Sequence, residues 1–315
     1  MLQNMSRDIH NTRQKKKICK GSIEKHQRKY GYIFALPWII GILLFYAYPL
    51  LSSIYYSFTN YNVISKVSWT GLENYEGLLK DPVFWTSITN TIVYALMSVP
   101  TSVLMGISLA LLLNIPIKAQ GIFRTIFFLP TLVPVVATSI IWQWLLNPQF
   151  GIVNFVLSKV GIAGPPWLGS PYWSKPSLVL MAQWAIGNMV IIYLAGLQDI
   201  SQDYYEAADL DGANWFQKAM CITLPLLSPV IFFNMIMSII NTLQVFTLPY
   251  TLTYGTGNPA NSLMFYSMYL YNNAFAYMKM GYASAMAWIL FIIIITITLF
   301  VFRSSTKWVF YQDEN

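Results

Sequence analysis

The sequence predicts an all-α integral membrane protein with six transmembrane helices and with both termini in the cytoplasm. Its composition is the first reason: 56% of the 315 residues are hydrophobic and only 10% are charged, whereas about a quarter of a soluble domain is charged. The second reason is a set of six apolar windows, each close to the roughly 20 residues with which a helix crosses a bilayer. The third is the uneven distribution of Lys and Arg along the chain.

The six apolar windows cover about 31–58, 87–113, 123–146, 177–197, 226–250 and 283–302. Several of them contain prolines, which membrane bundles tolerate because neighbouring groups satisfy the freed backbone. These prolines are Pro37, Pro49, Pro100, Pro130, Pro134 and Pro249. The first window is too long for a cleaved signal peptide, and no small-residue cleavage site follows it. We therefore expect it to be the first span.

The basic segment 1–30 sets the predicted orientation, because Lys and Arg collect in cytoplasmic loops. It holds nine of the 19 Lys and Arg residues, and with it inside, the inner segments carry fourteen and the outer segments five. The predicted organisation is a basic cytoplasmic tail (1–30), a six-span transmembrane domain (31–302) and a cytoplasmic tail (303–315). We interpret the first tail as a topology determinant near anionic lipid rather than a nucleic-acid arm.

The sequence lacks the residues of a catalytic, cofactor or metal site. No glycine is followed by lysine, which excludes the phosphate-binding Gly-Lys loop. His10 and His26 both precede the first window, which excludes a histidine-based zinc site or a Ser-His-Asp triad in the membrane. Cys19 and Cys221 fall on the predicted cytoplasmic side, so we expect no disulfide. We predict no enzyme activity, no metal and no cofactor on this chain.

The predicted spans are also free of ionisable side chains. No Asp, Glu, Lys, Arg or His occurs in 31–65, 83–117, 125–158, 176–198, 219–278 or 280–302. Proton-coupled carriers generally depend on such groups. Backbone carbonyls alone can hold sodium, so ion coupling is disfavoured rather than eliminated. The pattern favours a neutral solute and a source of free energy on another subunit.

One predicted cytoplasmic loop concentrates acidic residues, against the trend for such loops. Five of the twelve acidic residues lie between Asp199 and Asp211. We expect two short helices here, the first capped by Asp203 with Glu206 three residues later. A turn at Asp211-Gly212 would precede a second helix over 213–220. Leu224-Pro225 would then break the chain before the fifth span.

The same loop is rich in small residues. Ala207, Ala208, Gly212 and Ala213 leave much of its surface without bulk, so another protein can approach the backbone closely. The neighbouring acids can meet basic residues of that partner and fix its register. The alternative is an ordinary solvated loop without a partner. We favour the interpretation that another protein docks on this loop.

These residues carry a resemblance to the EAA loop of ABC-importer permeases. The matching positions are Glu206-Ala207-Ala208, Asp211-Gly212-Ala213, Ile222, Leu224-Pro225 and Pro229. The wider chain, from about 31 to 302, is similar to the maltose-type carbohydrate-uptake family, a binding-protein-dependent group of sugar importers. The segment "LTYGTGNPANS" departs from that family at Thr256, where a second glycine is usual.

The resemblance implies the fold of a type I ABC importer permease, multi-pass in a prokaryotic plasma membrane. It implies four kinds of partner besides lipid: a second homologous permease subunit, a cytoplasmic ABC ATPase dimer, an extracellular solute-binding protein and a sugar, with no nucleic acid. ATP and Mg²⁺ would bind to the ATPase. The implied ATPase-coupling residues are Glu206, Ala207, Ala208, Asp211, Gly212, Ala213, Leu224 and Pro225.

Two spans offer uncharged polar side chains for a substrate pathway. In the fifth span, Asn234, Ser238, Asn241 and Gln244 or Val245 recur at spacings of three to four, with Thr242 beside them. The fourth span offers Gln183, Trp184, Gly187 and Asn188. Amides and hydroxyls can pair with sugar hydroxyls, and an aromatic face suits a pyranose ring. The alternative is that these amides hold helices together.

Three functions are compatible with a six-span chain of this kind. The sequence favours the sugar permease of an ABC importer over a self-sufficient secondary carrier and over a membrane scaffold or insertion factor without a pathway. Disaccharides, raffinose-like or xylan-derived oligosaccharides and pentose oligomers all suit these side chains. A glycerol phosphate is less favoured, because no span residue offers a positive charge.

Overall fold

The computed structural model describes residues 30–116 and 118–310, and its regular elements over these ranges are helices. The predicted basic tail, with His10, His26 and Cys19, therefore lies outside the described residues except for Tyr30. Residues 311–315 of the second predicted tail lie outside them too. The chain forms two compact units, Met1–Tyr56 and Ser57–Asn315.

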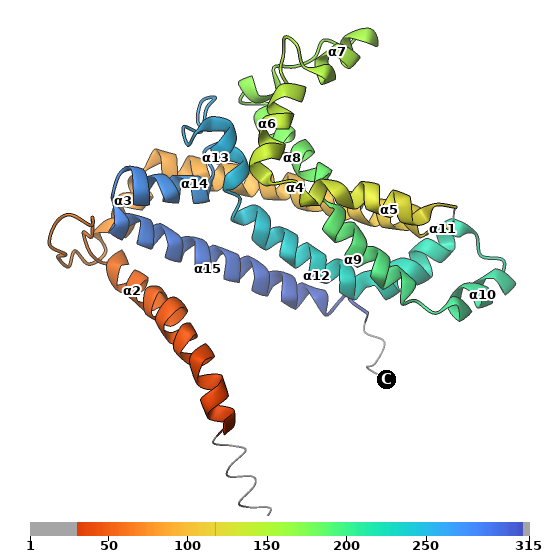
Figure 1. Ribbon diagram of the computed structural model, residues 1–315, viewed down its shortest axis with the longest axis horizontal. Coiled ribbons are helices and arrows are strands. Elements are labelled where there is room, and N and C mark those ends of the chain that lie inside the picture. The colour runs from red at the N-terminus through yellow and green to blue at the C-terminus, as the bar shows by residue number, and fades with distance from the viewer. Residues whose placement is uncertain (1–29, 117, 311–315) are drawn as a thin grey trace, which may run out of the picture. The chain divides into compact units, whose positions relative to one another are not determined.

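The first unit is described from Tyr30 onward as a single apolar helix (Figure 1). It contains a π-helical turn, η1 (Leu43–Ala47), and continues as α2 (Tyr48–Ser57). Its large apolar side chains are exposed, among them Phe34 at 82% and Phe45 at 77%. A helix that is apolar all round suits lipid as its solvent, and its 28 residues are long enough to span a bilayer.

The second unit contains the remaining helices. Its first half comprises α3 (Glu73–Lys80), α4 (Pro82–Asn114), α5 (Gln120–Phe128), η2 (Leu129–Leu132), α6 (Val135–Leu145), α7 (Ile152–Lys159), η3 (Trp167–Gly169), α8 (Ser174–Trp184) and α9 (Gly187–Gln198). Its second half comprises α10 (Gln202–Leu210), α11 (Trp215–Lys218), η4 (Ala219–Thr223), α12 (Leu224–Leu243), α13 (Thr247–Thr253), α14 (Tyr266–Tyr271), η5 (Asn272–Ala276) and α15 (Met280–Ser305).

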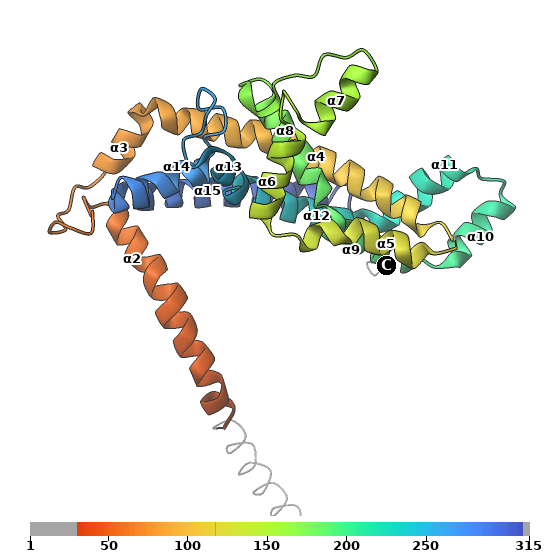
Figure 2. The ribbon, with the colours of Figure 1, turned by 45° about the horizontal axis from the view of Figure 1, so that its top comes forward.

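The long helix α4 is the centre of this unit. It packs against α8, α9 and α12, and α12 packs against α15 on its other side. Figures 1 and 2 show α10 and α11 at one end of this bundle, and α3 and α14 at the other. A buried cluster where α4, α9 and α12 meet includes Ala110, Val190, Tyr193 and Leu227. This cluster lies on the side of the bundle toward α10.

By length and composition, the described residues form between four and six candidate spans, and the predicted six are reached when each of two bent helix pairs counts as one span. Four helical stretches are long and apolar enough to cross a membrane: Tyr30–Ser57, Pro82–Asn114, Trp215–Thr253 and Met280–Ser305. Two bent pairs account for the third and fourth windows: Gln120–Leu132 with Val135–Leu145, bent by 99°, and Ser174–Trp184 with Gly187–Gln198, bent by 52°. The cytoplasmic placement of the termini stays a prediction.

The sharper bend has a local cause. Pro134 caps the start of α6, and the preceding residue, Val133, adopts an extended backbone with ψ 127°. A residue before proline avoids the helical region because the proline ring crowds it. Pro100, by contrast, stays inside the continuous helix α4.

Candidate functional site

The predicted docking loop, residues 198–225, contains two helices, α10 and α11, joined by a left-handed turn. Gly212 follows α10 with φ +73°. Its N–H donates to the Asp209 carbonyl at 3.1 Å, and the Ala213 N–H donates to the Ala208 carbonyl at 2.9 Å. These two bonds form a Schellman motif, which glycine favours because it has no Cβ to crowd a positive φ.

The turn is exposed and has empty space beside it. A Cβ built on Gly212 would meet no atom within 4 Å. Glu206, Ala207 and Asp211 are exposed, and Ala213 is half-buried. The remaining predicted coupling residues, Ala208, Leu224 and Pro225, are half-buried. The surface around Gly212 is therefore free for close approach, although its role in coupling stays a prediction.

Sequence reasoning missed an apolar rim around this turn. Leu210 is 91% exposed, and Trp215 and Phe216 are also largely exposed. Large apolar side chains left exposed beside a polar turn are available for contact with a partner. Their signal in the sequence is an apolar residue on each side of Asp211-Gly212, in a segment that is otherwise polar.

Two local expectations for this loop are wrong. Ser201, not Asp203, caps α10, and its hydroxyl accepts from the Asp203 N–H at 3.3 Å. Asn214 and Gln217 form the capping box, at the start of α11. The Ser201 cap arises because α9 ends at Gln198 and leaves Ser201, a good capping residue itself, directly before α10.

The expected break at Leu224-Pro225 is also wrong. α11, the π-helical turn η4 and α12 form one continuous helix, with Pro225 in the first turn of α12. A π-turn adds one residue to a helical turn and so interrupts the regular α-helical hydrogen bonding, and Pro225 lies just after this interrupted stretch. The docking loop therefore leads directly into the fifth span.

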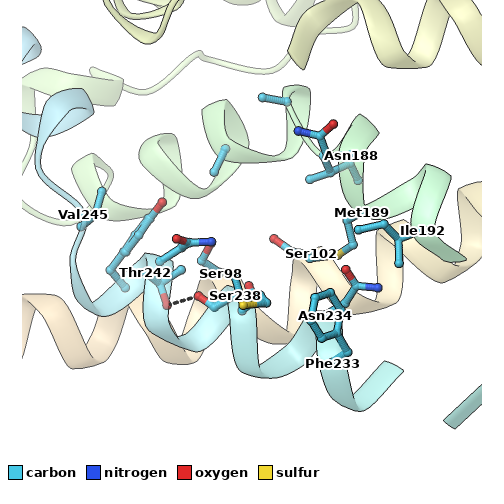
Figure 3. Close-up of a pocket in the computed structure, with 16 residues that line it drawn as sticks. Ser98, Ser102, Asn188, Met189, Ile192, Phe233, Asn234, Ser238, Thr242 and Val245 are labelled. Carbon is cyan, nitrogen blue, oxygen red and sulfur yellow. Dashed lines mark hydrogen bonds between the residues drawn. The ribbon is translucent and has the colours of Figure 1, made fainter. Parts of the chain in front are cut away.

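A cavity of about 490 Å³, which we call the polar cavity because half of its lining residues have polar side chains, lies along that span between α4, α9, α12 and the end of α8. Figure 3 shows its side chains converging from these helices. Its lining consists of Tyr94, Ser98, Ser102, Ala182, Ala185, Ile186, Asn188, Met189, Ile192, Phe233, Asn234, Met237, Ser238, Asn241, Thr242 and Val245. Over the part of the chain that the structure describes, none of these is charged.

Five of the predicted pathway residues meet in this cavity: Asn188, Asn234, Ser238, Asn241 and Thr242. On α12, Asn234 and Thr242 are buried. The Thr242 hydroxyl donates to the Ser238 carbonyl at 2.8 Å, as the dashed line in Figure 3 marks. Asn188 and Asn241 are exposed, so their amides are available to a solute.

Gln183 and Trp184 lie in a different cavity. This second space, of about 340 Å³, is lined mostly by apolar side chains of α4, α5, α6 and α8. The rings of Trp184 and Trp142 meet edge to face, with their centroids 6.2 Å apart. The bend between α8 and α9 separates the two cavities, and Ile186 borders both. The structure thus does not bring Gln183 and Trp184 together with the other five.

The last two predicted pathway residues, Gly187 and Gln244, line neither cavity. A Cβ on Gly187 would lie 2.6 Å from the carbonyl oxygen of Phe127, which is closer than real Cβ contacts. Gly187 therefore allows α9 to pack closely on the α5 segment. Gln244 is the exposed C-cap of α12.

Sequence reasoning missed the contribution of α4 to the polar cavity. Ser98 and Ser102 line it, together with Tyr94. These three recur every four residues, which places them on one helical face. That spacing, in a span without charges, is the signal that identifies them.

At the other end of the bundle, Asp81 ties three helices together. Its carboxylate accepts from the Val83 N–H at 2.8 Å at the start of α4, from Tyr282 at 2.9 Å and from Tyr269. Burial pushes the pKa of Asp81 upward, but hydrogen bonds from the two tyrosines and from backbone N–H groups outweigh it and hold that pKa below its usual value. Asp81 is therefore a charged anchor between α4, α14 and α15.

Comparisons with known proteins agree with these features. The family model for the binding-protein-dependent transport system inner membrane component matches residues 102–309. The probable ABC transporter permease protein YesP of Bacillus subtilis is 39% identical over 287 residues, which cover 90% of this chain and 93% of YesP. The lactose transport system permease protein LacF of Rhizobium radiobacter is 36% identical, covering 91% and 98%.

A third relative and a solved structure extend the same pattern. The trehalose/maltose transport system permease protein MalF of Thermococcus litoralis is 32% identical, covering 88% of this chain and 94% of its own length. The crystal structure of a bacterial alginate ABC transporter, in complex with an alginate pentasaccharide-bound periplasmic protein, contains a similar chain. That chain matches with a TM-score of 0.78 at 25% identity, covering 89% of this chain and 95% of its own.

Proposed function

Since the chain belongs to the family of binding-protein-dependent transport system inner membrane components, we propose that it moves a neutral sugar across the membrane through the cavity beside α12. It is the permease subunit of a sugar ABC importer. The same relationship favours this function over a self-sufficient secondary carrier, because the relatives are subunits of ABC transporters.

One observation carries the proposal: a single continuous helix links the docking loop to the polar cavity. α11, η4 and α12 run without a break from Trp215, three residues after Gly212, to Asn234, Ser238 and Thr242. A partner that binds the turn therefore lies next to the start of the helix that lines the cavity. Such a helix can convert a push at one end into rearrangement at the other.

The partner at the turn would be a cytoplasmic ATPase. The exposed acids and the small residues beside them, with the apolar rim at Leu210 and Trp215, suit a groove that has basic and apolar walls. ATP and Mg²⁺ would bind to that subunit, since this sequence lacks a phosphate-binding Gly-Lys loop. The residues proposed for coupling are Glu206, Ala207, Ala208, Asp211, Gly212, Ala213, Leu224 and Pro225.

The other partners follow from the same family. A second homologous permease would complete the pathway, because the cavity is open and its rim residues Asn188 and Asn241 are exposed. An extracellular solute-binding protein would deliver the substrate, as the periplasmic protein of the alginate transporter carries its pentasaccharide.

The substrate would be a neutral di- or oligosaccharide. Among the described residues, the cavity offers amides, hydroxyls and apolar contacts but no charge, which fits hydroxyl groups and leaves an ionic group without a partner. The relatives LacF and MalF are named for lactose and for trehalose and maltose. The volume of about 490 Å³ lies within the usual range for small-molecule sites.

A detergent pull-down of the tagged chain from native membranes tests the assembly. We expect a nucleotide-binding subunit and a second permease to be recovered with the wild-type chain. Gly212→Asp should lose the nucleotide-binding subunit but keep the second permease. If the wild-type chain were recovered alone after mild extraction, the importer function would be wrong.

A further inference from the structure

Two side-chain contacts join α10 to the start of the fifth span. The Tyr205 hydroxyl lies 3.0 Å from the Thr223 hydroxyl. The Lys218 ammonium lies 2.7 Å from the Asp209 carboxylate. We call these four residues the loop latch.

The spacing of the latch matches the π-helical turn. Tyr205 and Asp209 are four residues apart, so they share one face of α10. Lys218 and Thr223 are five residues apart and flank or lie in η4. In a π-helix the backbone hydrogen bonds join residues five positions apart. The π-turn therefore brings the Lys218 and Thr223 side chains to the same face of the helix. Without the extra residue of the π-turn, only one of the two side chains, Lys218 or Thr223, would face α10.

The two contacts differ in burial. Thr223 is 5% exposed, and the Tyr205 ring packs against the apolar cluster that includes Leu227. The Lys218 and Asp209 side chains are 22% and 62% exposed. Ion pairs exposed to water contribute little, whereas a hydrogen bond to a buried hydroxyl such as that of Thr223 is costly to break. The Tyr205–Thr223 contact is therefore the strong one.

The direction of this hydrogen bond follows from its neighbours. The Thr223 hydroxyl donates to the Lys218 carbonyl at 3.3 Å. A hydroxyl has a single proton to donate, so Thr223 accepts from the Tyr205 O–H. The result is a chain of hydrogen bonds from α10 to the carbonyl of Lys218, across the π-turn.

We propose that Tyr205 and Thr223 are positioning residues that couple the docking loop to the fifth span. This proposal rests on the proposed function. This partly buried hydrogen bond makes α10, α11 and the start of α12 move as one body, so that displacement of the turn by the ATPase reaches the cavity. Without the hydrogen bond, α10 would move on its own and ATP hydrolysis would proceed without opening and closing the pathway.

The test follows access to the cavity rather than any particular sugar. Met237 lines the cavity and is 42% exposed, so Met237→Cys provides a reporter after both native cysteines are replaced by serine. The complete complex, with its ATPase and second permease, is placed in vesicles. Labelling by a membrane-impermeant maleimide is then measured with and without ATP plus vanadate, and ATP hydrolysis is measured in parallel.

We expect ATP plus vanadate to change the labelling rate in the reporter background. Tyr205→Phe and Thr223→Val should lose this change while ATP hydrolysis continues. Thr223→Ser keeps the hydroxyl and should keep the response. Lys218→Gln removes the ion pair with Asp209 but keeps the exposed acids and the Lys218 carbonyl, and is the matched control, which should respond like the background.

Two results would overturn the proposal. One is a normal labelling response in Tyr205→Phe, or a loss in Lys218→Gln as large as in Tyr205→Phe. The other is a parallel fall of labelling response and ATP hydrolysis, which indicates a merely structural role. Failure of the proposed function looks different: the reporter background itself would lack ATP hydrolysis and a nucleotide-dependent response.

Discussion

Asn234 and Asn241 line the same cavity, but they are held differently on α12. The Asn234 amide is buried and donates to the Val230 carbonyl at 3.1 Å, within its own helix. The Asn241 side chain is exposed at the cavity rim. Asn234 therefore shapes the wall, whereas Asn241 has an amide to offer to a solute.

Substitution of Asn241 by alanine should weaken sugar binding without destabilising the protein. A neutral hydrogen bond contributes about 0.5–1.5 kcal/mol, so we expect KM for uptake to rise by about 2- to 10-fold. The melting temperature should stay unchanged because Asn241 is exposed. Gln244→Ala is the comparison: Gln244 is also exposed on α12 but does not line the cavity. Equal changes of KM in both variants would contradict the assignment of the cavity.

Substitution of Gly212 by aspartate should abolish uptake while the protein still reaches the membrane. The loss of folding stability in this variant is modest. Space is open beside the glycine, and a left-handed backbone costs a non-glycine residue about 1–2 kcal/mol. The loss would come from the partner that must approach this turn. Gly161→Asp is a close control, since Gly161 also has a positive φ and open surroundings but lies after α7. Loss of uptake in both variants would point to strain rather than docking.

Substitution of Gly187 by alanine should destabilise the contact between α9 and the α5 segment. The new Cβ would lie 2.6 Å from the Phe127 carbonyl and 2.8 Å from the Thr131 methyl group. Overpacking of this kind typically costs 1–3 kcal/mol, which should lower the melting temperature of the purified protein. Gly121→Ala, where a Cβ meets no atom within 4 Å, should leave it unchanged. If Gly187 contacted the substrate and had no packing role, Gly187→Ala would instead change KM for uptake and leave the melting temperature unchanged.

Substitution of Asp81 by asparagine should loosen the joint between α4, α14 and α15. The variant keeps one acceptor but loses the charge that binds the Tyr269 and Tyr282 hydroxyls, at a cost of about 1–3 kcal/mol. Glu76→Gln, at an exposed acidic residue of α3, is the control and should have no effect on the melting temperature. An unchanged melting temperature in Asp81→Asn would show that the anchor contributes nothing.

The Asp81 carboxylate should also make the stability of the protein depend on pH. The folded-state pKa of Asp81 is lowered, so its contribution is fully present above the unfolded value of about 3.9. That contribution is lost as the pH falls through the lower folded-state pKa. Thermal unfolding in detergent should therefore show an acid-side loss of stability that is smaller in Asp81→Asn than in the wild type. Identical pH profiles would contradict the linkage.

The sequence located the spans well because a bilayer imposes their length directly. A run of about 20 apolar residues is required whatever the tertiary contacts are. The bends were not predictable in this way. Pro100 continues a helix while Pro134 begins a new one after a 99° bend, and both appear in the sequence as a proline inside an apolar window. Their difference depends on whether neighbouring structure satisfies the freed backbone groups.

The candidate site was predicted in part for a related reason. Helical spacing correctly grouped Asn234, Ser238 and Asn241, because α12 is regular over these residues. It failed for Gln183 and Trp184, because the break after α8 turns them toward a different cavity. Likewise Ser201 and Asp203 are both good caps, and the choice between them depends on where α9 ends.

Uptake by the reconstituted complex tests the central claim most directly. The chain, with its second permease, ATPase and solute-binding protein, is placed in proteoliposomes that contain ATP, and the uptake of labelled lactose, maltose, trehalose and longer neutral oligosaccharides is followed. We predict accumulation of a neutral sugar that requires hydrolysable ATP and persists when proton and sodium gradients are collapsed. Accumulation without ATP that stops when those gradients collapse would contradict the account and identify a secondary carrier.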